Sequence, residues 1–414
     1  MQKPQSYDLV ISGAGITSAI GQGVPAFTSA LFGGETAFRE MRRQGRQRPQ
    51  PAEGSLYLGA ELESLALPDR ITGHKFPSAS LSAQAALATV HEAWHDARLE
   101  QVDPQRIGLI VGGSNLQQRE LLLTQEKYRD KIAFLRPTYG FAFLDSDIAA
   151  ICSEAFGIRG PCFTVGGASA SGHVAAIQGI QAIASGVVDA CIVVGALTDL
   201  SYFECQALRS MGAMGSDRFA GQPELACRPF DSESDGFIYG ESCGAIVMER
   251  YSHARRPGVE AILAFSGWAM SMDANRGPEC SLDGEVEVIR RVLQQAGIEP
   301  REIDYVNPHG SGSSLGDRTE LQALRACGLS HAPINATKSI TGHGLSAAGV
   351  VELIATLVQV KAGKLHPSRN LENPIDSSFR WIGPVAEEHP VRAALNLSYG
   401  FGGVNTAICL SALR

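Results

Sequence analysis

The chain has 414 residues, of which 44% are apolar and 19% are charged, with 45 glycines and 20 prolines. This composition is typical of a compact soluble protein with many tight turns and excludes a fibrous or largely disordered chain. A formal net charge of −8 argues against nucleic acid as the main ligand, because phosphate binding needs a dense field of lysine and arginine.

The hydropathy pattern contains no targeting or membrane signal. The first eight residues are polar, and no later segment reaches the roughly 18 uninterrupted apolar residues of a membrane span. We therefore expect a cytoplasmic protein with no membrane partner.

Short apolar runs bounded by glycine, aspartate or proline predict buried parallel strands. In chain order these runs are Leu9–Ser12, Ile107–Val111, Ala190–Val194, Gly244–Met248, Tyr305–Asn307 and Ala394–Leu397. Apolar residues at three-to-four spacing predict helices between them, at Ala83–Leu99, Ala170–Ser185, Gly284–Ala296 and Ala347–Ala362. The alternation predicts an α/β fold. The basic, proline-rich stretch Arg39–Pro51 is expected to be an exposed loop.

Nine cysteines are scattered along the chain without a CxxC pair. This distribution favours buried free thiols in a reducing compartment over a disulfide or zinc framework. They are Cys152, Cys162, Cys191, Cys205, Cys227, Cys243, Cys280, Cys327 and Cys409.

Ser169 follows a strand-like segment and two glycines and directly precedes a long apolar helix. The amides and dipole at a helix N-terminus favour developing negative charge, so this position suits a nucleophile or an oxyanion site. A simple N-cap serine is an equally good interpretation of this segment alone. A serine-hydrolase elbow fits less well, because the run Gly167–Ser171 lacks the final glycine of GxSxG.

Two histidines lie in glycine-rich loops that follow strands and precede helices. His309 belongs to the run Asn307–Asp317, and His343 belongs to the run Thr337–Gly344, which also contains Lys338. A lone histidine is usually structural, but two in such loops with a lysine beside one indicate a catalytic site.

Three further patterns belong to other functional classes. The run His91–His95 fits the H-E-x-x-H zinc motif, but no third histidine follows at the extended spacing. The run Gly13–Gly15 resembles half of a dinucleotide fingerprint and lacks its third glycine. His173 lies four residues after Ser169 and could act as a base, although a packed helix residue is the favoured interpretation.

The segments around the two histidines resemble those of the β-ketoacyl synthases, which carry a Lys-Ser-x-x-Gly-His run like Lys338–His343. Further matching segments, in the same order, are Arg228–Asp231 with Asp235–Phe237, and Asn396–Asn405 with its Gly-Phe-Gly-Gly turn. The resemblance implies the thiolase fold, in which duplicated βαβ-rich halves form a five-layer αβαβα sandwich. We expect the halves to be 1–250, carrying Ser169, and 251–414, carrying His309, Lys338 and His343. The resemblance to the β-ketoacyl synthases also implies a homodimer.

Ser169 stands where this family has its nucleophilic cysteine. A thiol at a helix N-terminus is partly ionised near neutral pH, whereas a serine hydroxyl is not, so acyl loading should be poor. The chain is therefore similar to the ketosynthase-like decarboxylases of polyketide β-branching cassettes. The expected activity converts malonyl-acyl carrier protein to acetyl-acyl carrier protein and carbon dioxide.

The resemblance also implies roles for the remaining site residues. His309 and His343 donate hydrogen bonds to the thioester oxygen, Lys338 holds the second histidine, and Phe237 lines an apolar seat for the carboxylate. The amides of Ser169 and Phe401 form a second oxyanion site, and Phe401 gates the acyl pocket. Ser311 and Ser313 replace the threonines that contact the phosphopantetheine arm.

No resident cofactor or metal is expected, because the arm arrives on the carrier protein. Arg209 and Lys75 are candidate contacts for that acidic partner. Two alternatives remain open: a condensing or acyltransferring enzyme that uses Ser169 as its nucleophile, and a non-catalytic partner subunit similar to a chain-length factor.

Overall fold

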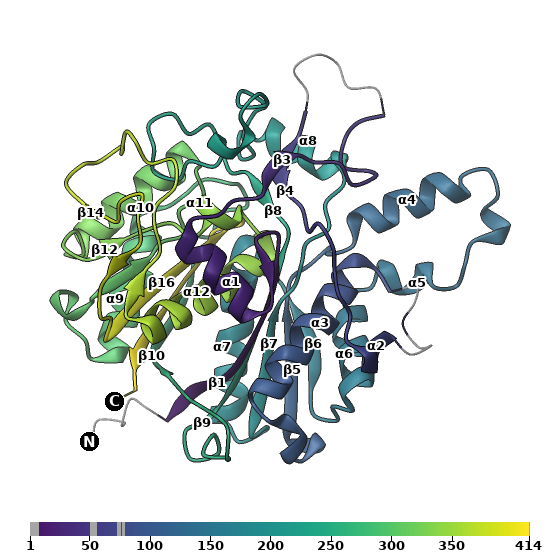
Figure 1. The fold of residues 1–414 in the computed structure, drawn as a ribbon, viewed down its shortest axis with the longest axis horizontal. Helices are drawn as coiled ribbons and strands as arrows, with labels where there is room; N and C mark the ends of the chain where they lie inside the picture. The colour runs from purple at the N-terminus through teal and green to yellow at the C-terminus, as the bar shows by residue number, and fades with distance from the viewer. Residues whose placement is uncertain (1–7, 50–55, 73–75, 77–78, 414) are drawn as a thin grey trace.

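The computed structural model describes residues 8–49, 56–72, 76 and 79–413 (Figure 1). Its main sheet has the strand order β14-β12-β11-β16-β17-β10-β1-β9-β7-β5-β6, with β2 (Gly21–Gln22) paired to β1. The N-terminal part of the sheet and the C-terminal part join where Val10 pairs with Ala264.

The two parts of the sheet repeat one order of elements. The first runs β1 (Leu9–Ser18), α3 (Leu81–Asp96), β5 (Ile107–Gly112), α6 (Asp147–Phe156), β6 (Cys162–Val165), α7 (Ser171–Ala184), β7 (Ala190–Gly195) and β9 (Ser242–Arg250). The second runs β10 (Leu263–Met272), α9 (Leu282–Ala296), β11 (Tyr305–Asn307), α10 (Ser314–Ala326), β12 (Pro333–Ile334), α12 (Ala348–Ala362), β16 (Ala393–Gly400) and β17 (Val404–Ala412). This duplication is that of the expected thiolase fold, whereas the division into 1–250 and 251–414 stays a prediction.

Shorter elements surround this framework. They are α1 (Val24–Gly33), β3 (Phe38–Glu40), β4 (Leu58–Ala60), α2 (Asp69–Thr72), α4 (Gln118–Tyr128), α5 (Tyr139–Ala142), α8 (Tyr202–Ser210), β8 (Tyr239–Gly240), α11 (Lys338–Thr341), β13 (Lys364–Leu365), β14 (Arg380–Trp381) and β15 (Glu387–Glu388). Helices α4 and α5 form an arm that projects from the body of the protein (Figure 1).

Three apolar clusters explain the layers. One fills the space between α3 and α6 and the N-terminal strands, and another lies between α9 and α10 and the C-terminal strands. The third contains α7 and α12 together with inward-facing residues of both sheet parts. The two helices therefore form the central layer of an α-β-α-β-α arrangement.

Local sequence explains where the main helices begin and end. The side chain of Ser80 accepts a hydrogen bond from the Ala83 amide at the start of α3, and Ser281 does the same for Gly284 at the start of α9. Helices α9 and α12 end at Gly297 and Gly363, whose φ angles of 65° and 62° are left-handed.

The prediction that all the apolar runs are parallel strands is wrong for two of them. β5 pairs with β6 and β7 in parallel, and β11 pairs with β12 and β16 in parallel. In contrast, β1 and β9, which contain Leu9–Ser12 and Gly244–Met248, run antiparallel to each other. Helices cover both faces of these strands as well, so a continuous apolar run reports burial on two faces and not strand direction.

The stretch Leu345–Ala362, which contains α12, is apolar and long enough to cross a membrane by composition alone. In the fold, 78% of this stretch is buried. The mainly apolar sequence of α12 therefore reflects its place in the central layer. All nine cysteines are free, as predicted, and all except Cys162 and Cys280 are buried.

The stretch Arg39–Pro51 is not simply an exposed loop, which corrects the prediction. Arg46 is fully buried and lies 2.5 Å from a carboxylate oxygen of Glu241, 2.9 Å from one of Asp199 and 3.5 Å from one of Glu61. Its side chain also stacks over the ring of Tyr239. A buried guanidinium is tolerated here because three carboxylates compensate its charge.

We expect Arg46→Leu to lower the free energy of unfolding by about 3–5 kcal/mol, because it removes the buried guanidinium that three carboxylates share and leaves only Arg43 and Arg119 to pair with two of them. The exposed neighbour Arg42 supplies a matched control, and Arg42→Leu should change stability by less than about 0.5 kcal/mol. The measurement is the urea midpoint of each variant. Equal midpoints for the two variants would show that the buried network does not stabilise the fold.

Candidate active site

Ser169 lies in a tight turn between β6 and α7. A short 3-10 segment, Ala168–Ala170, forms the turn, and Ala168 has a φ of 48°, which is unusual for a residue other than glycine. The hydroxyl of Ser171 accepts from the Gly167 amide and donates to the Ala168 carbonyl, which holds this conformation. Local hydrogen bonds therefore stabilise a strained turn that presents Ser169.

The hairpin between β16 and β17 packs directly against this turn. A Cβ atom on Gly400 would lie 2.2 Å from the Gly167 carbonyl oxygen, so only glycine permits the approach. The hydroxyl of Ser398 also donates to the Ser169 carbonyl at 3.3 Å. Phe401 follows at the tip of the hairpin and is thereby brought beside Ser169.

His309 follows β11, and its backbone is fixed by a buried carboxylate. Glu320 of α10 accepts hydrogen bonds from the amide of His309 at 2.6 Å and from that of Gly310 at 2.8 Å. The Nδ1 atom of His309 is buried and has no partner among the described residues. The ring is thus placed mainly through its backbone.

His343 lies between α11 and α12. Its backbone is hydrogen-bonded to Gly240 of β8 and to Ile238, the residue that precedes β8. Its amide donates to the Ile238 carbonyl at 2.7 Å, and its carbonyl accepts from the Gly240 amide at 3.1 Å. The amide of Leu345 donates to Nδ1 of the ring at 3.2 Å. Since Nδ1 accepts, the proton of a neutral His343 ring is on Nε2.

Lys338 contacts the first histidine and not the second, which corrects the expected role. Its ammonium group donates to the His309 carbonyl and lies 2.5 Å from a carboxylate oxygen of Glu352 on α12. Lys338 is the first residue of α11, and its two contacts join this helix to the segment after β11 and to α12. Lys338 is 1% exposed, so this is a buried ion pair.

Burial keeps both histidines neutral. It lowers the pKa of His309 well below the ordinary value, and the charge of Lys338 and the neighbouring His343 lower it further. Burial also lowers the pKa of His343, with Lys338 as the second cause. The ring centroids are 5.5 Å apart with nearly perpendicular planes. The pair can therefore donate hydrogen bonds without carrying positive charge.

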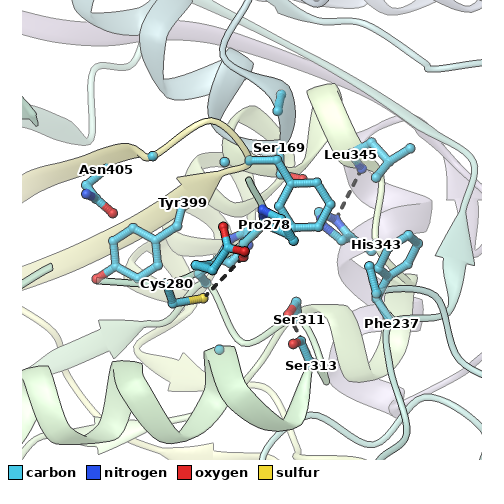
Figure 2. A pocket seen from close by; sticks show the side chains of 18 of the residues that line it. Ser169, Phe237, Pro278, Cys280, Ser311, Ser313, His343, Leu345, Tyr399 and Asn405 are labelled. Carbon is cyan, nitrogen blue, oxygen red and sulfur yellow. Dashed lines mark hydrogen bonds between the residues drawn. The ribbon is translucent and has the colours of Figure 1, made fainter. Parts of the chain in front are cut away.

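One cavity of about 220 Å³ brings the predicted site residues together (Figure 2). Its lining includes Ser169, Phe237, His309, Ser311, Ser313, His343 and Phe401. Phe237 meets the ring of His343 edge-on at 5.0 Å, and Phe401 is 40% exposed at the rim. Lys338 does not line the cavity, and it contacts the lining residue His309 through the carbonyl of that residue.

The three competing patterns do not join this cavity's lining. Glu92 accepts from the amides of Val24 and Ile16, so it is a structural carboxylate. Within the part of the chain that the structure describes, no group of three histidine, cysteine or acidic residues could hold a metal ion. His173 is fully buried and hydrogen-bonded to Thr406, as its packed interpretation requires.

Gly13 and Gly15 are in the middle of β1, where a dinucleotide loop would not form. A Cβ atom at Gly15 would lie 2.2 Å from the Thr89 carbonyl oxygen of α3. The two glycines therefore allow a helix to pack closely on a strand.

The sequence interpretation missed several acidic groups. Glu320 is three residues after Asp317 on α10, and this spacing could have indicated that the two acids lie on one helix face. Glu352 interrupts an otherwise apolar stretch of α12, and its isolation could have indicated a buried acid. Burial raises the pKa of Asp317 to about 6, that of Glu320 to about 8 and that of Glu352 to about 7. Glu285, on the first turn of α9, also lines the cavity and gave no such signal.

Of the two basic residues proposed for carrier contact, Arg209 is engaged internally. It donates to the carbonyls of Leu56 and Gly215 and stacks over the ring of Tyr57 at 4.5 Å. Lys75 lies outside the described residues.

Comparison with known proteins agrees with this geometry. The family models "Beta-ketoacyl synthase, N-terminal domain" and "Beta-ketoacyl synthase, C-terminal domain" match residues 7–254 and 262–372. The chain is 54% identical, over its full length and 99% of the relative, to the "Polyketide biosynthesis malonyl-ACP decarboxylase PksF" of Bacillus subtilis (strain 168). It is 29% identical, over 98% of both chains, to a "Putative polyketide beta-ketoacyl synthase 1" of Streptomyces halstedii.

Solved structures show the same fold. A β-ketoacyl synthase from Burkholderia phymatum STM815 superposes with a TM-score of 0.87 at 24% identity, over 99% of this chain and all of that one. A ketosynthase solved with its type II polyketide acyl-carrier protein gives 0.86 at 24% identity, with the same coverage. With both family models matched in order along most of its length, the chain belongs to the β-ketoacyl synthase family.

Proposed function

We propose that this protein decarboxylates malonyl-acyl carrier protein to acetyl-acyl carrier protein in polyketide biosynthesis. The observation that carries the proposal is a pair of neutral histidines lining one cavity with a serine in the nucleophile position. The 54% identity to a protein named as a malonyl-ACP decarboxylase supports it. The acetyl product suits the β-branching cassettes in which such enzymes occur.

Decarboxylation of the malonyl thioester requires the site to stabilise an enolate. As the bond between Cα and the carboxylate breaks, negative charge develops on the thioester oxygen. Nε2–H of His343 and a ring N–H of His309 donate to that oxygen, each contributing about 3 kcal/mol. Phe237, which packs on His343, offers the departing carbon dioxide an apolar surface.

Ser169 is not equipped to act as a nucleophile. Its hydroxyl has no hydrogen bond to a histidine in the region that the structure describes, so no base is in place to take its proton. The Ser169 and Phe401 amides remain available as a second oxyanion site. The phosphopantetheine arm comes with the carrier and passes Ser311 and Ser313, so the reaction needs no resident cofactor.

The two alternatives predict different products. A condensing or acyltransferring enzyme leaves an acyl group on Ser169, and a partner subunit similar to a chain-length factor makes no product. Incubating the purified protein with malonyl-carrier and detecting carbon dioxide and acetyl-carrier by mass spectrometry tests the proposal. Its failure to form acetyl-carrier would overturn it.

We expect His309→Ala and His343→Ala each to lower kcat for decarboxylation about 10²–10³-fold, because each removes a donor to the enolate oxygen. The exposed His331 provides the control, and His331→Ala should keep full activity. Circular dichroism confirms folding. Full activity of either site variant would rule out its proposed role.

Ser169→Ala should retain most decarboxylation, because the histidine donors and the amide at position 169 survive the change. Ser169→Cys should gain acylation by an acyl thioester, since sulfur has an accessible anionic form at a helix N-terminus. Intact-protein mass spectrometry detects the added acyl group. An inactive Ser169→Ala together with acyl-Ser169 trapped in the native protein would favour the serine acyltransferase.

We also propose that the protein is a cytoplasmic homodimer joined along the edge strand β6. Phe163 of β6 is 39% exposed, and the neighbouring arm carries Ile132, Phe134, Phe141 and Phe143, all more exposed still. The Thr164 hydroxyl donates to the Asp145 carbonyl, which connects the strand and the arm. An unpaired edge beside exposed aromatic rings is suited to pairing with a second copy.

Sedimentation should therefore give twice the chain mass of 43.9 kDa. Phe163→Lys should shift the protein towards monomer, because it places a charge in the paired edge. Val385→Lys changes a residue that is 75% exposed elsewhere and should leave the mass unchanged. A wild-type protein that sediments as a monomer would exclude this interface.

A further inference from the structure

The cavity has a polar side wing away from His343 and Phe237. Figure 2 shows Tyr399, Cys280 and Asn405 together on this side, across the cavity from the histidine and phenylalanine rings. The lining of this wing comes from the start of α9, the segment before it, the end of β16 and the start of β17. It comprises Asp273, Cys280, Glu285, Tyr399 and Asn405.

Glu285 is a buried carboxyl group in this wing, and its Oε2 atom has no partner among the described residues. The residue is 1% exposed. The exposed Glu279 also lines the cavity, whereas three other nearby carboxylates each accept a hydrogen bond from a side-chain or backbone N–H. These acceptors are Asp273 from Asn405, Asp317 from Phe230 and Gly312, and Glu320 from His309 and Gly310.

This environment favours the protonated form of Glu285. Burial raises the pKa of its carboxyl group well above the ordinary value, and the charges of Glu320, Asp273 and Asp317 raise it further. A neutral carboxylic acid carries a transferable proton at neutral pH, whereas an ordinary surface glutamate does not.

An enzyme that decarboxylates without condensation needs a proton donor for the enolate carbon, which a condensing enzyme does not need. A condensing enzyme consumes its enolate by attack on an acyl group, but here the enolate carbon must take up a proton. The neutral histidines hold their N–H groups on the enolate oxygen. The proton for carbon must therefore come from another group that faces the cavity or from water.

We propose that Glu285 supplies that proton, an inference that rests on the proposed decarboxylation. Loss of carbon dioxide leaves the electron pair of the broken bond in the enolate. The O–H bond of Glu285 then breaks, and its proton passes through a cavity water to Cα while the thioester carbonyl re-forms. The resulting carboxylate recovers a proton from solvent at the open rim, so each turnover consumes one proton.

The test uses the full-length protein with Glu285→Gln, which keeps the size and neutrality of the side chain but removes the acid. We expect acetyl-carrier formation to slow about 10²-fold. A longer-lived enolate can recapture carbon dioxide, so ¹³C from added ¹³C-bicarbonate should enter malonyl-carrier faster than in the wild type. The exposed Glu287 of the same helix gives the control Glu287→Gln, which should change neither rate.

The pH profile gives a second readout that a structural role would not move. Acetyl formation by the wild type should fall as rising pH removes the Glu285 proton, and Glu285→Gln should lack this fall. Other titratable groups around Glu285 are common to both proteins and cancel in the comparison. They are Asp273, Glu279, Cys280, His309, Asp317, Glu320 and Tyr399.

The possible results of these experiments distinguish a failure of this inference from a failure of the proposed decarboxylation. A folded Glu285→Gln protein with wild-type acetyl formation and exchange would overturn the inference and assign protonation to water. Loss of both acetyl formation and exchange would also overturn it, because bond cleavage itself would then have failed. A wild type that makes no acetyl-carrier would instead overturn the proposed function, and the inference with it.

Discussion

The close approach of helices α7 and α12 fixes where the reacting groups meet. A Cβ atom on Gly172 would lie 2.8 Å from the Val350 amide nitrogen, and one on Gly349 would lie 2.8 Å from the ring of His173. Both positions therefore need glycine for the helices to touch. Ser169 precedes α7 and His343 precedes α12, so this contact between the duplicated halves determines the distance between the oxyanion turn and the second histidine.

A single buried cation organises the rest of the site. Lys338 joins the end of β11, through the His309 carbonyl, to α12, through Glu352. Removing this ammonium group would leave Glu352 buried without its counter-charge, which is more costly than the pair itself is stabilising. The same positive charge adds to burial in holding both imidazoles neutral. The position of His309 and, together with burial, the neutral state of both donors thus depend on one residue that does not line the cavity.

Local patterns were enough to predict six of the strands, four of the main helices and the turn at Ser169, but not β10, β17, α6 or α10. Each depends on neighbours in sequence: apolar runs, helical spacing and small residues before a helix. The missed features depend on distant partners. Arg46 looked exposed because its basic neighbours suggest a solvated loop, yet Glu241, its partner, is 195 residues away. Glu285 looked like an ordinary acid in the first turn of a helix, since only the tertiary fold encloses it.

The distribution of charge explains how an anionic substrate enters a cavity walled by acids. Ionised side chains at Glu285 and Glu320 would repel the malonyl carboxylate at close range in a poorly screened space. Burial raises the pKa of both groups, which lowers the negative charge that these two side chains present to the substrate. The substrate carboxylate can then lie on the opposite side, against Phe237, where desolvation favours its conversion to neutral carbon dioxide. The burial that favours the neutral form of these two acids therefore also helps to orient the bond that breaks.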